Sequence, residues 1–297
     1  MLCLARRAPA LRSRCRTALY PWGPAAPRGS RRRRTVLLPP VALLGLCVLG
    51  LPAGLPAVAS ARPVVTLKAA VVPIPIDLSK PHSATYPGTG AILGAPAALE
   101  LEDTIAGTEY WDSPSPLTQI KVYTPAGVTV HMQGFATCSE VILMAKGAAG
   151  CPKRSFVSTL GEARGVVSFG GSRIHEEVTL RGFFNAGGGY IFYVVGSTPV
   201  SLEVFEKGTL ANASPPFGKV FTGEVPLVET VPGAPDGSVE QFKLTVGAAF
   251  RQGSKLVSYA TNPRTCPRGG APLKVELSFL SGETVPAEER LPCPKHR

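Results

Sequence analysis

The sequence predicts an all-β, antiparallel, sandwich-like fold of the immunoglobulin-like or jelly-roll-like kind. Three observations lead to this prediction. Short segments alternate apolar and polar residues, as strands with one buried face do. The 297 residues include 30 prolines and 32 glycines, which divide the chain into short pieces. Good helix formers rarely follow one another, so we expect at most one short helix, near residues 139–147.

The first 61 residues are expected to form a long disordered n-region followed by a signal peptide. The arginines at 31–34 precede the apolar run 36–51, and Ala59-Ser60-Ala61 matches an A-x-A cleavage site. Proline and glycine interrupt the apolar run, which is shorter than the roughly 20 residues of a membrane-spanning helix. Cleavage after Ala61 would give a secreted or cell-surface protein, whereas an uncleaved leader would anchor the protein in the membrane.

The formal net charge of +11 belongs to this leader. Residues 1–61 hold ten of the 31 basic residues and no acidic residue, which leaves 21 basic and 20 acidic residues in the rest of the chain. A near-neutral chain lacks the excess of basic residues that proteins use to bind nucleic acid. We therefore expect no nucleic-acid partner, and contact with a membrane only through an uncleaved leader.

Residues 62–297 are expected to form the β-sandwich region, either as one domain or as two subdomains that meet near residues 232–236. Pro73 and Pro75 restrict the first strand to a sheet edge, because proline cannot donate a ladder hydrogen bond. Alternating apolar residues and intervening turn residues predict strands at 62–78, 97–105, 117–123, 128–131, 163–169, 173–185, 190–195, 200–205, 220–228, 239–250, 255–259 and 273–279, and a last edge strand that ends at Cys293.

The expected helix begins after Ser139, a suitable N-cap. Val141, Met144 and Ala145 recur at helical spacing and form its predicted apolar face. Gly147 is expected to end it, because glycine commonly follows the last turn of a helix.

Seven cysteines divide into three in the leader and four beyond it: Cys138, Cys151, Cys266 and Cys293. An even number of cysteines in an exported chain predicts disulfides. Of the three possible connectivities we favour the two local pairs, Cys138–Cys151 and Cys266–Cys293. A zinc site built from the four thiolates is the alternative, but no C-x2-C pair supplies the usual spacing of its ligands.

The sequence contains no common catalytic motif. It has no G-x-S-x-G elbow, P-loop, dinucleotide fingerprint or H-E-x-x-H zinc motif. His175-Glu176-Glu177 could be an acid–base or metal cluster. On a strand, however, His175 and Glu177 share one face and Glu176 points the other way, so a solvated strand face is the simpler interpretation. We expect no cofactor and no metal, and the sequence argues against an enzyme more than for one.

One predicted strand carries several acidic residues. Glu100 and Glu102 share one of its faces, and the other face holds Leu99 and Leu101 with Asp103 as a candidate third member. Paired carboxylates serve glycoside hydrolysis, but two acids on a half-exposed strand usually form its solvated side.

Tyr110-Trp111 is the best candidate for ligand contact. An exposed aromatic pair in a Gly/Pro-rich segment could stack on a sugar ring, whereas the simpler interpretation is a loop aromatic packed on the edge of the sandwich. We therefore expect a non-catalytic binding or structural role in the cell envelope or outside the cell, with carbohydrate or protein as candidate partners. The alternative is a carbohydrate-active enzyme, which would need two carboxylates from separate strands about 5 to 9.5 Å apart in a concave pocket.

Six short motifs are spread over the part of the chain beyond the leader. They are GFATC at 134–138, CPKRS at 151–155, SPPFG at 214–218, ETVPGAP at 229–235, CPRGG at 266–270 and LPCP at 291–294. Together they resemble a widespread family of exported, β-rich proteins from high-GC actinobacteria. The resemblance covers nearly all of residues 62–297 and implies export, β-structure and paired cysteines. That family has no assigned activity, so the resemblance implies no catalytic residue.

Overall fold

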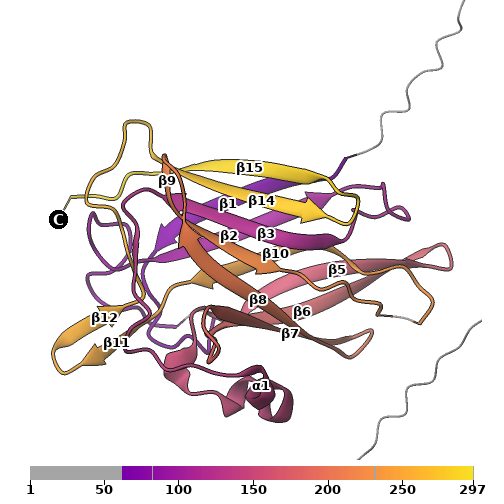
Figure 1. Ribbon diagram of the computed structural model, residues 1–297, viewed down its shortest axis with the longest axis horizontal. Helices are drawn as coiled ribbons and strands as arrows, with labels where there is room; N and C mark the ends of the chain where they lie inside the picture. Colours follow the sequence, from indigo (N-terminus) through magenta and orange to yellow (C-terminus); the bar gives the residue numbers. More distant parts are fainter. Residues whose placement is uncertain (1–61, 82, 231, 297) are drawn as a thin grey trace, which may run out of the picture. The chain divides into compact units, whose positions relative to one another are not determined.

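The computed structural model describes residues 62–81, 83–230 and 232–296 (Figure 1). The predicted signal peptide and n-region, residues 1–61, lie outside the described residues. The described chain is all-β and antiparallel with one short α-helix, which confirms the predicted fold class.

The elements of the described chain follow one another as strands, with the helix and two 3₁₀ turns, Ala148–Gly150 and Lys153–Ser155, between the fourth and fifth strands. Their bounds are β1 (Val64–Val72), β2 (Ala98–Ala106), β3 (Leu117–Pro125), β4 (Thr129–Val130), α1 (Glu140–Lys146), β5 (Gly161–Phe169), β6 (Ser172–Phe184), β7 (Tyr190–Thr198), β8 (Leu202–Asn212), β9 (Phe217–Glu224), β10 (Ser238–Val246), β11 (Ala249–Gln252), β12 (Lys255–Ser258), β13 (Ala260–Thr261), β14 (Ala271–Phe279) and β15 (Thr284–Leu291).

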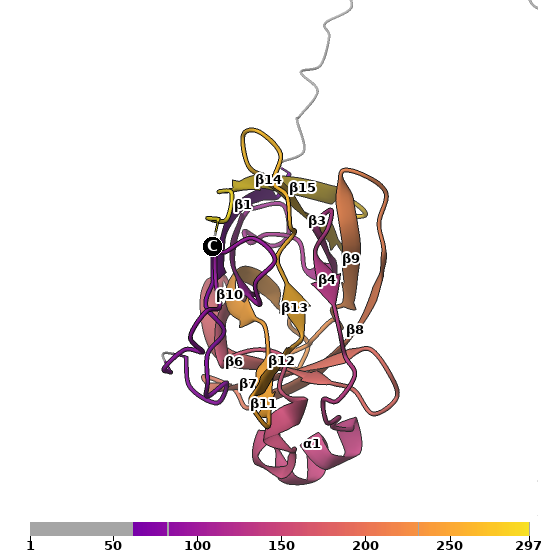
Figure 2. The same ribbon diagram turned by 90° about the vertical axis from the view of Figure 1, so that its left-hand side faces the viewer.

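Eleven of these strands form one antiparallel sheet in the order β1-β2-β10-β5-β6-β7-β8-β9-β3-β14-β15. The sheet curls until its edge strands β1 and β15 lie side by side, so that it is nearly closed and barrel-like (Figure 2). Arg62 Nε lies 3.0 Å from Glu283 Oε1 and links the beginnings of these two edge strands. The two flanks of the single sheet thus face each other across a shared interior, as the two sheets of a sandwich would.

The short strands β4 and β13 pair with each other and lie across one end of the curled sheet (Figure 2). Asn262, directly after β13, fastens this end because its Nδ2 donates to the carbonyl oxygens of Gly90 and Ile92 at 2.7 and 2.9 Å. The interior is therefore covered at this end by loops and by a two-stranded piece.

The sequence pattern explains the positions of several strands. β1 is an edge strand, as predicted, but it ends at Val72, directly before Pro73, rather than continuing to residue 78. Along β14 every second side chain, Ala271, Leu273, Val275, Leu277 and Phe279, is buried, and this confirms the alternation expected for this segment. Residues 232–236, the suggested subdomain boundary, lie between β9 and β10, which belong to the same sheet.

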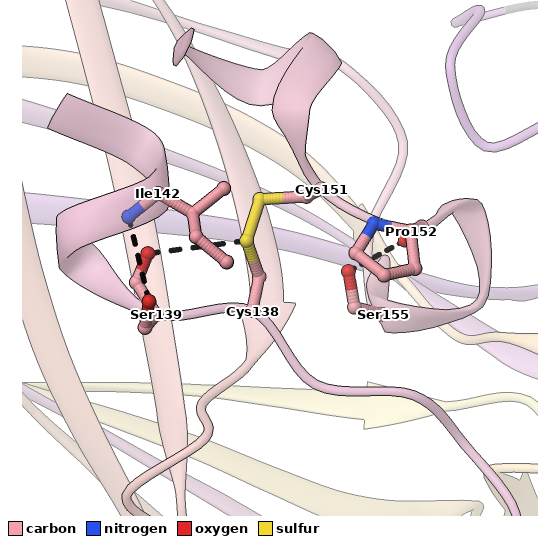
Figure 3. The surroundings of a disulfide bond; sticks show 6 residues. All are labelled: Cys138, Ser139, Ile142, Cys151, Pro152 and Ser155. Atoms are coloured by element: carbon pink, nitrogen blue, oxygen red, sulfur yellow. Dashed lines mark hydrogen bonds between the residues drawn. A yellow bond between two sulfur atoms is a disulfide. The ribbon is translucent and has the colours of Figure 1, made fainter. Parts of the chain in front are cut away.

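Both predicted disulfides are present, with Cα–Cα distances of 5.5 Å for Cys138–Cys151 and 5.7 Å for Cys266–Cys293. Figure 3 shows the first of them beside the start of α1. The predicted cap of this helix is also confirmed, because Ser139 Oγ accepts a hydrogen bond from the Ile142 amide at 3.4 Å. Gly147, with φ of 61°, ends the helix.

The predicted apolar face of α1 was wrong. Val141 and Met144 are 69% and 56% exposed, and Ala145 is exposed as well, whereas the buried helix residue is Leu143. The disulfide and the Ser139 cap fix how this two-turn helix meets the sheet, and Leu143 then packs with Cys138 into the core. Tertiary packing therefore outweighs the spacing of apolar residues here.

Candidate functional site

A cavity of about 300 Å³ runs through the interior of the curled sheet. It lies between two clusters of buried side chains, one containing Phe192 and Leu244 and the other containing Leu101 and Leu291. Phe221 packs against both clusters. Side chains just fill the interior of an eight-stranded barrel, so a sheet of eleven strands encloses more space than its side chains can fill.

The cavity wall is almost entirely apolar, as the alternation of β7 and β8 illustrates. On β7 the lining residues are Tyr190, Phe192 and Val194, and on β8 they are Leu202, Val204, Glu206 and Leu210. Successive side chains of a strand point to opposite faces of a sheet, so each of these residues points inward and its neighbours point outward. Glu206 is thus the one ionisable residue in an inward-facing row of aliphatic side chains.

The neighbours of Glu206 fix its direction. Phe205 stacks on Tyr193 of β7 with ring centroids 5.3 Å apart, and Tyr193 does not line the cavity. Lys207 Nζ lies 2.8 Å from Glu140 Oε2 of α1, which covers the outside of the sheet. Because both neighbours are engaged on the outer face, the Glu206 carboxyl group must lie on the inner one.

The Glu206 carboxyl group has no hydrogen-bond or ion-pair partner among the described residues. Its remaining accessible surface faces the cavity, because the residue lines that cavity. Burial away from bulk water raises the pKa of Glu206 to about 7. Glu206 therefore gives the cavity wall a carboxyl group that changes its charge near neutral pH.

Glu176 on β6 points inward and is buried, on the face opposite to His175 and Glu177. Its Oε2 accepts a hydrogen bond from the Val200 amide at 3.3 Å, in the connection between β7 and β8. Gly196 leaves the space for this carboxylate, since a Cβ at that position would lie 2.6 Å from Glu176 Oε1. Glu176 thus ties the β7–β8 connection to β6.

Glu176 and Glu206 lie at different positions along the strands of the cavity wall. Glu176 lies against Gly196, which pairs with Leu202 at the start of β8, four residues before Glu206. Four residues of strand span roughly 13 Å of backbone. The carbohydrate-active enzyme, which would need two carboxylates about 5 to 9.5 Å apart, stays a prediction.

Asp103 is fully buried and lies on the same face of β2 as Leu101. It therefore belongs to the apolar face of the strand, where the sequence had made it a candidate third member. Neither of its carboxyl oxygens has a partner among the described residues, and burial raises its pKa to about 7. Asp103 does not line the cavity. It packs beside Leu67 of β1 and Phe242 of β10, its neighbours in the strand register.

The other acidic candidates form ion pairs on the outer face of the sheet. His175 Nδ1 lies 3.1 Å from Glu240 Oε2, and Arg164 Nε reaches the same oxygen at 3.2 Å. Glu102 pairs with Lys68 at 3.3 Å. These contacts match the simpler interpretation of both acidic patterns as outward strand faces.

The structure separates the two predicted binding aromatics. Trp111 is 69% exposed, with φ of 51°, and lies over a surface hollow that also includes Phe169. Tyr110 is only half-exposed, and its backbone pairs with Ser113 on the other side of the turn. Trp111 and Phe169, rather than Tyr110 and Trp111, are therefore the aromatic side chains that share a surface.

Within residues 62–81, 83–230 and 232–296, no three side chains of the kinds that ligate metals come together. No helix in the same part of the chain has the length and apolar character needed to cross a bilayer.

Comparison with models of known protein families gives no match, and neither does comparison with curated proteins. The function is therefore inferred from the cavity, with its apolar wall and Glu206. Sequence reasoning missed Glu206, because the predicted strand 200–205 ended one residue before it. The signal that could have found it is the continued alternation of Leu202, Val204, Glu206 and Leu210.

Proposed function

We propose that this protein is a non-catalytic binding protein that takes a small apolar molecule into the interior of its curled sheet. The observation that carries the proposal is the cavity of about 300 Å³ with an almost wholly aliphatic and aromatic wall. Binding sites for small molecules are usually preformed concave spaces of this kind, apolar with a few polar groups. An apolar cavity of about 150 Å³ already accepts benzene. The space here therefore suits a longer, flexible apolar molecule.

The partners expected from the sequence, carbohydrate or protein, stay predictions. Trp111 and Phe169 would be the aromatic side chains available to them on the surface. The apolar interior is the stronger basis for a proposal, because an unfilled core forfeits contacts that a ligand could restore.

A fluorescence titration with the neutral dye N-phenyl-1-naphthylamine tests the proposal. The oxidised full chain should bind the dye with a large rise in emission, because the dye leaves water for an apolar site. Val204→Phe should weaken binding by at least about tenfold, since Val204 lines the cavity and the added ring would occupy it.

Val195→Phe is the matched control, because Val195 lies next to the cavity-lining Val194 but is not part of the wall. It should leave dye binding within about twofold of the unsubstituted protein. Thermal unfolding of both variants verifies that they fold. Equal binding by Val204→Phe and Val195→Phe would show that the dye does not enter the interior, and the proposed function would be wrong.

We further propose that the protein acts outside the cytoplasm after cleavage behind Ala61. Two disulfides indicate an oxidising compartment, which supports this proposal. The intact mass of the exported product should begin at Arg62 and rise by about 4 Da on reduction, two hydrogens for each S–S bond. A product that still contains residues 36–61 would instead show a retained anchor.

A further inference from the structure

Glu206 has no partner among the described residues and places one polar group in the largely apolar wall of the cavity. Glu176, Tyr190 and Tyr259 are the other ionisable side chains of the same wall, and Arg164 also lines it while its guanidinium group pairs with Glu240 on the outer face. Glu176 Oε2 accepts a hydrogen bond from the Val200 amide, although Glu176 Oε1 has no partner among the described residues, and the two tyrosine hydroxyls bond each other at 2.7 Å.

The strands on either side of β8 also leave Glu206 isolated. Facing it from β7 is Phe192, its partner in the strand register, and β9 contributes Phe221 and Gly223 to the same wall. β9 presents no charged or hydrogen-bonding side chain to the cavity, and the Tyr190 hydroxyl of β7 is already bonded to Tyr259. A buried polar group without a partner destabilises the folded protein. A ligand that supplies the missing hydrogen bond removes this destabilisation.

We propose that Glu206 binds the head group of the ligand, and that this head group donates hydrogen bonds, with a primary amine preferred over an alcohol and a carboxylate disfavoured. The inference rests on the proposed function, because it identifies the end of the apolar ligand that lies at Glu206. The ligand class is thus an elongated apolar molecule with a single hydrogen-bond-donating or cationic end.

The preference for an amine follows from where the desolvation costs arise. Glu206 is half-buried and lines the cavity, so binding desolvates mainly the head group of the ligand. An ammonium group then forms a charge-assisted hydrogen bond, which is about twice as strong as a neutral one. A carboxylate ligand would bring a second negative charge next to Glu206 and would be repelled.

Displacement of bound N-phenyl-1-naphthylamine by decylamine, decan-1-ol and decanoate tests the preference at pH 8. Decylamine, which is cationic at this pH because alkyl amines titrate near pH 10, should bind at least about tenfold more tightly than decan-1-ol. Decanoate should bind most weakly. At pH 5 Glu206 is protonated, so decylamine should lose most of this advantage while decan-1-ol is unaffected.

Glu206→Gln should bring decylamine and decan-1-ol to within about threefold of each other, each measured against the variant's own affinity for the dye. Glu203→Gln is the matched control, because Glu203 lies on the outer face of the same strand. It should keep the full preference for decylamine. Since Glu206→Gln removes a carboxyl group from an apolar site, it should fold at least as stably as the unsubstituted protein.

The outcomes separate the two proposals. Dye binding that all three decyl compounds displace equally, or an amine preference that survives Glu206→Gln, would overturn the role of Glu206 and leave the apolar site standing. Absence of dye binding to the folded protein would overturn the proposed function itself.

Discussion

Replacing Asp103 by asparagine should raise the free energy of unfolding by about 4 kcal/mol at pH 8 and by less than about 1 kcal/mol at pH 4. The folded pKa of Asp103 is about 7 against an ordinary value of 3.8, a difference of about three units. Each unit corresponds to about 1.4 kcal/mol of differential stability. Asparagine has the same shape but no charge, so it leaves packing unchanged and removes the pH-dependent part.

The sign of the effect follows from proton binding. Between pH 4 and pH 7 the folded state keeps the proton on Asp103 while the unfolded state has lost it, so the stability of the natural protein falls as pH rises through this range. Above pH 7 both states are ionised and the loss is complete. Urea unfolding at pH 4 and pH 8 measures the difference between the two proteins.

Glu102→Gln is the control for this experiment, because Glu102 lies next to Asp103 but pairs with Lys68 on the outer face of β2. Such exposed pairs contribute less than about 1 kcal/mol, so the variant should show no gain at pH 8. If Asp103→Asn is no more stable than the natural protein at pH 8, then Asp103 is not the isolated buried carboxyl group described above.

Removing the Cys266–Cys293 disulfide by a double substitution to alanine should lower the free energy of unfolding by about 3.5 kcal/mol. The bridge joins two residues that are 27 positions apart in the sequence. Without it the unfolded chain gains conformational entropy, and in the chain-entropy model this gain lowers the free energy of unfolding by that amount. Cys293 is exposed, so little packing is lost with its sulfur atom. Urea unfolding of the double variant measures the loss.

This disulfide also lies at one end of the cavity, since Cys266, Pro292 and Pro294 contribute to its wall. The double variant should therefore bind N-phenyl-1-naphthylamine more weakly at a temperature at which it is still folded. The corresponding change at Cys138 and Cys151 should lower stability without that effect on the dye, because neither residue lines the cavity. A loss of stability below about 1 kcal/mol for the Cys266 and Cys293 variant would contradict this account.

The sequence predicted those parts of the fold that local chemistry determines. Proline placed β1 at a sheet edge, alternation placed β14 in the core, and cysteine spacing gave both disulfides. Ser139 and Gly147 gave the ends of α1. Each of these features depends on a few neighbouring residues, so it can be read from a short segment.

The parts that the sequence did not predict depend on distant residues. The buried face of α1 was missed because the disulfide and Leu143, not the apolar spacing, orient the helix. The single curled sheet arises because β10 inserts between β2 and β5, which joins segments far apart in the chain. The cavity depends on that closure, so no local pattern could reveal it. Glu206 becomes a candidate only once β8 is known to continue past Phe205.

The central claim is that an apolar ligand enters the sheet and lies along β7 and β8 beside Glu206. Methyl-group NMR of the folded protein titrated with decylamine at pH 8 tests this claim most directly. Ligand binding should shift the methyl signals of Val194, Val204 and Leu210, which line the cavity, and should leave those of Val195 and of Val141 on α1 unchanged. Shifts confined to Val141 and other exposed methyl groups, with the signals of the cavity wall unmoved, would contradict it.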